Sequence, residues 1–146
     1  MEQFLASLKE VGASDIQRST PCRRDFKTGL YHCRFEIADS KLELSESLSE
    51  KKLVSIKSPK NPDHSGRELH PLIVMATCGI QLKEEAEKVI LFLEDAARRD
   101  KSKSTLYKIG ACGLSMFSSE IWMTPDYSWR FDAENAVQVP VVQAHE

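Results

Sequence analysis

The sequence predicts an α+β domain in which a mostly antiparallel sheet is packed by two helices. Alternation of apolar and polar residues begins at residue 30, a helical period runs through residues 81–101, and short alternating runs return beyond residue 104. With 146 residues, the chain has the usual length of one domain, so we expect a single core over residues 1–146.

The helix at residues 81–101 is the clearest element of the sequence. Its apolar residues recur three and four positions apart, with acidic residues crowding the start and basic residues the end, as the helix dipole favours. Leu91 and Phe92 widen the apolar face, which predicts packing on two sides. Residues 2–11 show the same periodicity over a shorter stretch that Gly12 ends, so a short amphipathic helix is expected there.

The strands are predicted from alternation, because successive side chains along a strand point to opposite faces of the sheet. Residues 132–146 hold alternating valines and a proline, and we expect them to form either an edge strand or a flexible tail. Residues 72–78 fit a strand and a buried helical turn equally well, and a strand there would give a βαβ crossover. The predicted strands cover residues 30–38, 41–46, 53–57, 106–117, 120–124 and 127–131.

Composition and charge argue against several classes of protein. Charged residues make up 29% and hydrophobic residues 41% of the chain, so we expect it to fold without a partner. The formal net charge of −2 provides no field that would draw the whole molecule to nucleic acid or to an anionic membrane. The amino-terminal residues lack the pattern of a signal peptide, and no apolar run reaches the roughly 20 residues of a membrane span. We therefore expect a cytoplasmic protein with no membrane contact.

The cysteines lie far apart in the sequence, and a chain of this size needs no cross-links to fold. We expect reduced thiols, mostly buried in the core. The sequence contains neither Cys-x-x-Cys nor His-x-x-x-His, the close ligand pairs that zinc sites use, so no metal site is predicted. It also lacks the glycine-rich phosphate-binding motifs, so no cofactor is expected. The four cysteines are Cys22, Cys33, Cys78 and Cys112.

Aromatic side chains provide the leading hypothesis for function. Trp122, Tyr127 and Trp129 lie close together in the sequence, and tryptophan and tyrosine often anchor protein interfaces. With Phe92 on the long helix, they predict a partner-binding surface, and packing in the core is the competing interpretation. The protein would then be a non-enzymatic interaction module, an adaptor, chaperone or regulator that acts as a homodimer through the 81–101 helix or the aromatic segment. An amphipathic helix followed by three strands also resembles the opening of small secretion chaperones.

A small enzyme is the first alternative. Asp63 and His64 lie in an exposed loop and have the residue types that acid–base chemistry uses. Cys112, beside a glycine, is a further candidate for such a site.

A regulator that binds nucleic acid is the second alternative. Arg23, Arg24 and the basic residues within 98–103 are the local positive clusters of the chain. Contacts from them to phosphates would make binding depend on salt. The acidic balance of the last third of the chain argues against phosphate contacts there.

Overall fold

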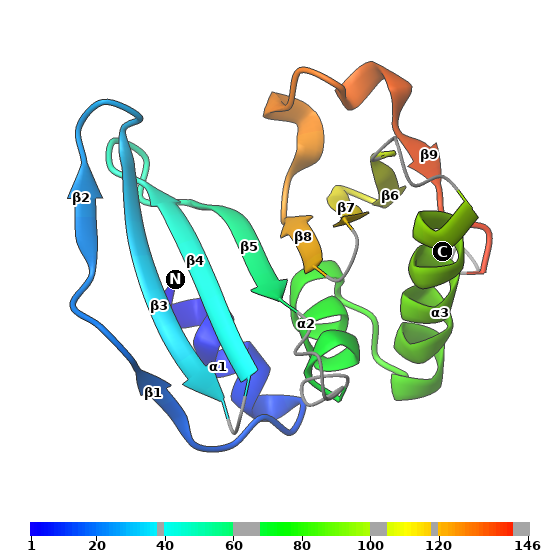
Figure 1. The fold of residues 1–146 in the computed structure, drawn as a ribbon, viewed down its shortest axis with the longest axis horizontal. Helices are drawn as coiled ribbons and strands as arrows, with labels where there is room; N and C mark the ends of the chain where they lie inside the picture. The colour runs from blue at the N-terminus through cyan, green and yellow to red at the C-terminus, as the bar shows by residue number, and fades with distance from the viewer. Residues whose placement is uncertain (38–39, 60–67, 100–104, 118–119, 142–146) are drawn as a thin grey trace.

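A computed structural model describes residues 1–37, 40–59, 68–99, 105–117 and 120–141 of the chain. The α+β prediction is confirmed, because three α-helices pack against a mostly antiparallel nine-stranded sheet (Figure 1). The strands follow the order β1-β3-β4-β5-β8-β7-β6-β9 across the sheet, and β2 pairs with β3 on the edge that β1 also occupies. They are β1 (Ile16–Arg18), β2 (Arg23–Asp25), β3 (Leu30–Ile37), β4 (Ser40–Ser47), β5 (Leu53–Pro59), β6 (Tyr107–Ile109), β7 (Cys112–Phe117), β8 (Glu120–Thr124) and β9 (Val137–Gln138).

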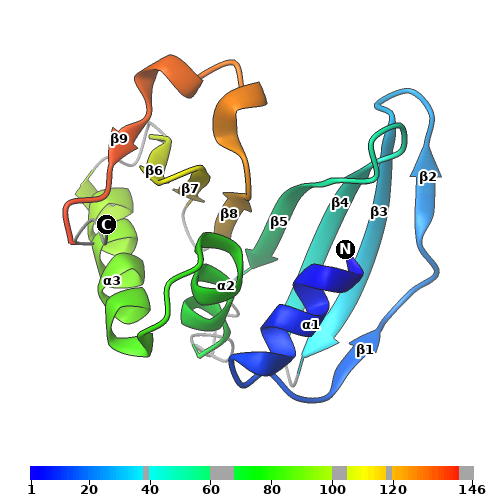
Figure 2. The same ribbon diagram turned by 180° about the vertical axis from the view of Figure 1, so that it is seen from behind.

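The helices lie on one side of the sheet. They are α1 (Glu2–Glu10), α2 (Leu69–Cys78) and α3 (Lys83–Arg99). Figure 2 shows α1 and α2 in front of the sheet, and Figure 1, from the opposite side, shows β3 and β4 in front of α1. α3 packs against α2 and β7. Among the described residues no α-helix covers the opposite face, which we call the outer face, and none of the helices is long and apolar enough to cross a membrane.

Alternation of residue types accounts for this one-sided core. On β3, Cys33, Phe35 and Ile37 are buried toward the helices, whereas Arg34 and Glu36 are exposed on the outer face. The neighbouring strand continues the pattern, since the residues of β4 opposite Cys33 and Phe35 are fully buried leucines. The hydrophobic effect therefore fixes the register, because a slip by one residue would turn these side chains to water.

The stretch predicted as one strand at residues 106–117 folds as a hairpin. β6 and β7 pair antiparallel, and Gly110 lies between them with a φ of 59°, a left-handed conformation that glycine adopts without strain. The polar segment before residue 30 contains two short strands, β1 and β2, that its composition does not predict. Both pair with β3, whose regular backbone edge organises them.

Residues 72–78, whose state the sequence leaves open, are helical and belong to α2. Ile73 and Val74 have no exposed surface, because α1, α3 and β8 contact this helix. A helix surrounded in this way needs no polar stripe, and its sequence then looks like that of a buried strand. Gly79 ends α2 in a left-handed conformation, with a φ of 70°. The chain passes from α2 to α3, so there is no βαβ crossover.

The strand predicted at residues 127–131 is wrong. Tyr127–Trp129 forms a 3₁₀-helix, η1, and a second one, η2, follows at Ala133–Asn135. A side-chain oxygen of Asp126 accepts a hydrogen bond from the backbone amide of Ser128 at 3.0 Å and so caps η1. This local cap competes with a strand for the same backbone groups.

Close packing of Tyr127 on the β6–β7 hairpin sets the course of the chain after β8. The Tyr127 amide donates to the Ala111 carbonyl at 3.0 Å. A Cβ atom added to Gly113 would lie 2.7 Å from the Tyr127 Cβ and 2.9 Å from the Thr124 Cγ2, so no larger residue fits beneath Tyr127. The chain therefore crosses the outer face of β7 and leaves the neighbourhood of β5.

We expect Gly113→Ala to lower the free energy of unfolding by about 1–3 kcal/mol, because the new methyl group overlaps the Tyr127 and Thr124 side chains. Urea denaturation measures the loss, and the emission of nearby Trp129 should change in the folded protein. Gly79→Ala is the control, since a methyl group there meets open space and costs only the left-handed conformation, roughly 1–2 kcal/mol. Unchanged stability and emission in Gly113→Ala would contradict this packing.

The prediction of reduced cysteines is wrong. All four form disulfides, Cys22 with Cys33 and Cys78 with Cys112. Folding brings the Cα atoms of the two pairs to 4.5 Å and 5.3 Å, separations that disulfides span and that wide spacing in the sequence conceals. Because disulfides are typical of oxidising compartments, the cytoplasmic prediction loses the support that reduced thiols gave it.

The Cys78–Cys112 bond joins the end of α2 to the start of β7 across a sequence separation of 34 residues. Replacing both cysteines by alanine should lower the free energy of unfolding by roughly 4 kcal/mol, because the unfolded chain regains the entropy of that loop. Removal of Cys22–Cys33, which spans 11 residues, should cost roughly 3 kcal/mol. Urea unfolding of the two double variants and the parent measures both losses. Equal stability of all three proteins would show that the bonds do not constrain the chain.

Candidate functional site

The sheet divides into two branches where β8 ends. β8 pairs with β5 from Ile56 to Pro59, but it stops at Thr124, and Pro125 has no amide hydrogen with which to continue a ladder. The first part of β5, Leu53–Ser55, therefore pairs with β4 and not with β8. In Figure 1 the upper part of β5 and the chain that follows β8 diverge from this point.

A pocket of about 790 Å³ lies in this divergence, and we call it the fork pocket. One wall comes from the β2–β3 turn, the β4–β5 turn and the start of β5, and the other from β8 and the chain up to residue 131. The lining residues are Thr28, Gly29, Leu30, Ser47, Ser49, Glu50, Lys52, Leu53, Val54, Ser55, Trp122, Met123, Thr124, Asp126, Trp129, Arg130 and Phe131.

Aromatic side chains dominate the wall that β8 and the chain up to residue 131 form. Trp122, Trp129 and Phe131 are 39%, 58% and 98% exposed, and they include both tryptophans of the protein. The Trp129 indole nitrogen donates to Thr124 Oγ1 at 3.2 Å, which fixes that ring at the end of β8. Trp122 lies on the outer face with the Lys57 ammonium 4.9 Å from its ring centre, a cation–π contact. The wall is thus a preformed apolar surface that is open to solvent.

The fork pocket is lined by two acidic residues, Glu50 and Asp126, and two basic residues, Lys52 and Arg130. The Arg130 guanidinium donates to both carboxylate oxygens of Asp132 at 3.0 Å, so its charge is paired. Lys52 and Asp126 come from opposite walls, and the charge of Lys52 acts on Asp126. Hydrogen bonds from the hydroxyl and amide of Ser128 are the larger effect, and together they hold the pKa of Asp126 below its ordinary 3.8.

The structure brings two of the four predicted partner-binding residues together. Trp122 and Trp129 line the fork pocket. Tyr127 is half-buried over Gly113, and Phe92 packs edge-on against Tyr107 of β6 with ring centres 5.1 Å apart. Tyr127 and Phe92 therefore lie apart from the pocket and contribute to packing between elements.

The residues of the enzyme alternative are not brought together. Asp63 and His64 lie outside the described residues. Cys112 is bonded to Cys78, so it carries no thiol that could act as a nucleophile. Within the described ranges, no group of three or more His, Cys, Asp or Glu side chains could hold a metal ion.

The two basic clusters of the nucleic-acid alternative lie at opposite ends of the molecule. Arg23 and Arg24 belong to β2, and Arg98 and Arg99 end α3 (Figure 1). The remaining residues of that cluster, 100–103, lie outside the part of the chain that the structure describes. The described residues of the two clusters therefore form no joint patch for a phosphate backbone.

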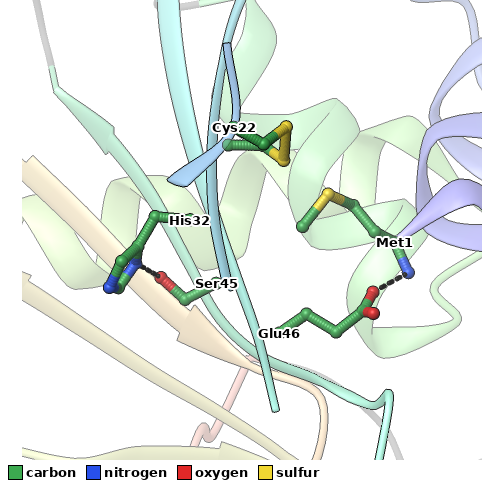
Figure 3. The surroundings of a disulfide bond; sticks show 6 residues. Met1, Cys22, His32, Ser45 and Glu46 are labelled. Atoms are coloured by element: carbon green, nitrogen blue, oxygen red, sulfur yellow. Dashed lines mark hydrogen bonds and ion pairs between the residues drawn. A yellow bond between two sulfur atoms is a disulfide. The ribbon is translucent and has the colours of Figure 1, made fainter. Parts of the chain in front are cut away.

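A second polar site on the outer face escapes prediction from sequence. The His32 Nδ1 lies 2.7 Å from the Ser45 hydroxyl, directly across from it in the β3–β4 ladder (Figure 3). Alternation places His32 on the outer face, but only the register of the hairpin shows that Ser45 is its neighbour. A smaller pocket of about 380 Å³ adjoins this pair.

Comparisons of the chain with protein-family models, with curated proteins and with solved structures find no match. Function is therefore argued from the geometry of the two pockets and from the residues that line them.

The capping carboxylate of Asp126 gives the fork pocket a defined response to acid. Because the folded protein keeps this group charged to lower pH than the unfolded chain, its stabilisation of η1 is complete above pH 3.8 and is lost as pH falls through the lower folded pKa. We expect the emission of Trp129 to change below pH 3.8, and the change should be absent in Asp126→Asn. A transition that the variant retains would assign the change to another group.

Proposed function

We propose that this protein binds a partner protein by taking up an extended segment of that partner in the fork pocket. One observation supports this most directly: the start of β5 has an edge that β8 does not pair with, and a wall of exposed aromatic side chains stands beside it. The activity is binding without chemistry, as expected for an adaptor, chaperone or regulator.

The edge of Leu53–Ser55 supplies the backbone part of such recognition. A strand that is paired on one side presents N–H and C=O groups on the other, and an extended peptide satisfies them by adding a strand. A register shift in β4 between Ser45 and Glu46 leaves Val54 without an opposite residue, so this part of β5 is locally irregular. The edge is short, which limits the added strand to a few residues.

The aromatic wall supplies the side-chain part. Tryptophan buries a large apolar area at small entropic cost and is enriched among residues that dominate binding energy. The volume of the fork pocket falls within the roughly 300–1,000 Å³ of typical ligand sites, enough for one large side chain of a peptide and its neighbours. Since two acidic and two basic residues line the pocket, the lining carries no net charge and favours an uncharged, apolar segment.

A second copy of this chain is the rival occupant, because homodimerisation is predicted from the same aromatic residues. Strand addition between copies would require each copy to donate an extended segment. Among the described residues the outer edges of the sheet are short: β1 and β2 are separated at Ser19–Cys22, and β9 spans Val137–Gln138. These edges offer little to a second copy, so a different protein fits the pocket better.

Both tryptophans line the fork pocket, so intrinsic fluorescence reports on it selectively. We expect a blocked hexapeptide with a Val-Phe-Val centre and threonine elsewhere to quench or blue-shift this emission in a saturable way. Trp129→Ala should weaken binding by at least about tenfold, with Trp122 as the remaining reporter. Leu91→Ala is the matched control, because Leu91 is equally exposed but lies on α3, away from the pocket.

The same peptide with N-methyl groups on alternate residues separates strand addition from simple apolar binding. It keeps the side chains but cannot pair with the β5 edge, so its affinity should fall sharply. Equal binding of the two peptides, or equal binding by Trp129→Ala and the parent, would contradict the proposal. Sedimentation that shows a dimer lost on Trp129→Ala would instead make a second copy the occupant.

A further inference from the structure

The smaller pocket on the outer face, here called the arginine pocket, lies beside the link between β1 and β2. It has a volume of about 380 Å³ and shares no residue with the fork pocket. Its chemistry is also different, since basic and hydroxyl side chains replace the aromatic ones. The lining residues are Thr20, Pro21, Arg23, His32, Cys33, Arg34, Glu43, Leu44 and Ser45.

Pairing in the sheet aligns three of these side chains in one row. Arg23 of β2 lies opposite His32, and His32 lies opposite Ser45, so all three project from the outer face. The Ser45 hydroxyl lies 2.7 Å from His32 Nδ1 and so holds the ring in place. When Nδ1 accepts from this hydroxyl, the ring proton is on Nε2, and Figure 3 shows that this second nitrogen points away from Ser45.

The charges that surround the pocket leave donors available. Arg34 Nε is 3.0 Å from Glu43 Oε1, which occupies one edge of that guanidinium only. Lys57 Nζ lies 4.0 Å from the other carboxylate oxygen of Glu43 and 3.2 Å from Glu120 Oε1, so its charge is shared between two carboxylates. Arg23 makes no salt bridge within the described residues, and its charge acts weakly on Asp25, whose carboxylate accepts hydrogen bonds from its own turn.

A covalent bond holds the wall of the pocket in position. β1 pairing ends at Arg18 and β2 pairing begins at Arg23, so the link Ser19–Cys22 bulges opposite Cys33 and Arg34. The Cys22–Cys33 disulfide ties the end of this link to β3, and the Ser19 amide donates to the Arg34 carbonyl at 3.0 Å. Arg23 directly follows the bonded cysteine, so its backbone has little freedom.

We infer that the arginine pocket binds the phosphate group of a small ligand. Two guanidinium groups, the His32 imidazole and the Thr20 hydroxyl line it from β2, β3 and the β1–β2 link, which suits the several acceptor oxygens of a tetrahedral dianion better than the two of a carboxylate. Because the wall is held by a disulfide, the backbone that carries Thr20 and Arg23 is positioned before the ligand arrives. This function is independent of peptide binding in the fork pocket.

Side-chain NMR of histidine, with the His32 signals assigned by their loss in His32→Gln, tests the inference on the folded, oxidised protein. Inorganic phosphate, phenyl phosphate and acetate are the probes, at pH 7.5 and constant ionic strength. We expect saturable shifts of the His32 signals with both phosphates and at least about tenfold weaker binding of acetate. Tighter binding of phenyl phosphate would identify a phosphate ester as the ligand, and equal binding would identify free phosphate.

Two arginine variants make the test specific. Arg23→Gln should weaken phosphate binding by about tenfold or more, because it removes a charged donor. Arg24→Gln changes the net charge equally, but Arg24 lies opposite Tyr31 on the other side of the strand and does not line the pocket, so it should bind as the parent does. Replacing Cys22 and Cys33 by alanine should also weaken binding, since it frees the wall.

The inference is overturned by absent His32 shifts, by acetate binding as tightly as phosphate, or by equal affinity of Arg23→Gln and the parent. Tryptophan emission recorded on the same samples keeps the two sites distinct, because both tryptophans line the fork pocket. Loss of peptide binding with phosphate binding intact contradicts only the proposed function, and the reverse contradicts only this inference.

Discussion

The contact between Tyr127 and Gly113 is the constraint on which the fork pocket depends most. Only a residue without a side chain leaves room for the Cβ of Tyr127 to pack against β7, with the Tyr127 amide bonded to the β6–β7 hairpin. Because of this contact, the chain changes direction immediately after Thr124 and Pro125 and does not continue β8. The start of β5, Leu53–Ser55, therefore has no strand on that side, and the fork pocket occupies the space between it and the departing chain.

The two faces of the sheet differ in what they contribute. The buried apolar side chains and all three helices lie on one face, where a single cluster of buried residues extends from Phe4 to Val139. The outer face carries the hydrogen-bonded pair His32 and Ser45 and a line of alternating charges that includes Glu43, Lys57 and Glu120. The exposed residues of the two pockets, such as Trp129 and Arg34, can thus be exchanged at little cost to the core, because they bury little surface in it.

Periodicity was sufficient to predict the elements that have one buried and one exposed side. The helix predicted at residues 81–101 is observed as Lys83–Arg99, since its amphipathic pattern leaves no other state in which its apolar side is buried. Residues 127–131 alternate equally well, yet the Asp126 cap and the packing of Tyr127 on Gly113 stabilise a 3₁₀-helix. Those interactions join residues that alternation does not relate.

In the candidate sites, too, the sequence could not predict which distant residues lie next to each other. Nothing in the spacing of the four cysteines indicates which of them meet, because the partners are set by how β3, α2 and β7 assemble. The exposed tryptophans of β8 and the chain after it could be proposed as a partner-binding surface from residue type alone. Its opposite wall, and the meeting of Arg23 with His32, depend on strand order and register.

The edges of the sheet have a consequence for the behaviour of the protein in concentrated solution. On one edge, the interruption at Ser19–Cys22 breaks the row of backbone donors and acceptors, and on the other, Pro140 follows closely after the short strand β9. Neither edge is a long, flat template on which another molecule could extend the sheet, and such templates are what amyloid-like polymerisation requires. The short and interrupted edge strands therefore disfavour aggregation by strand pairing between molecules.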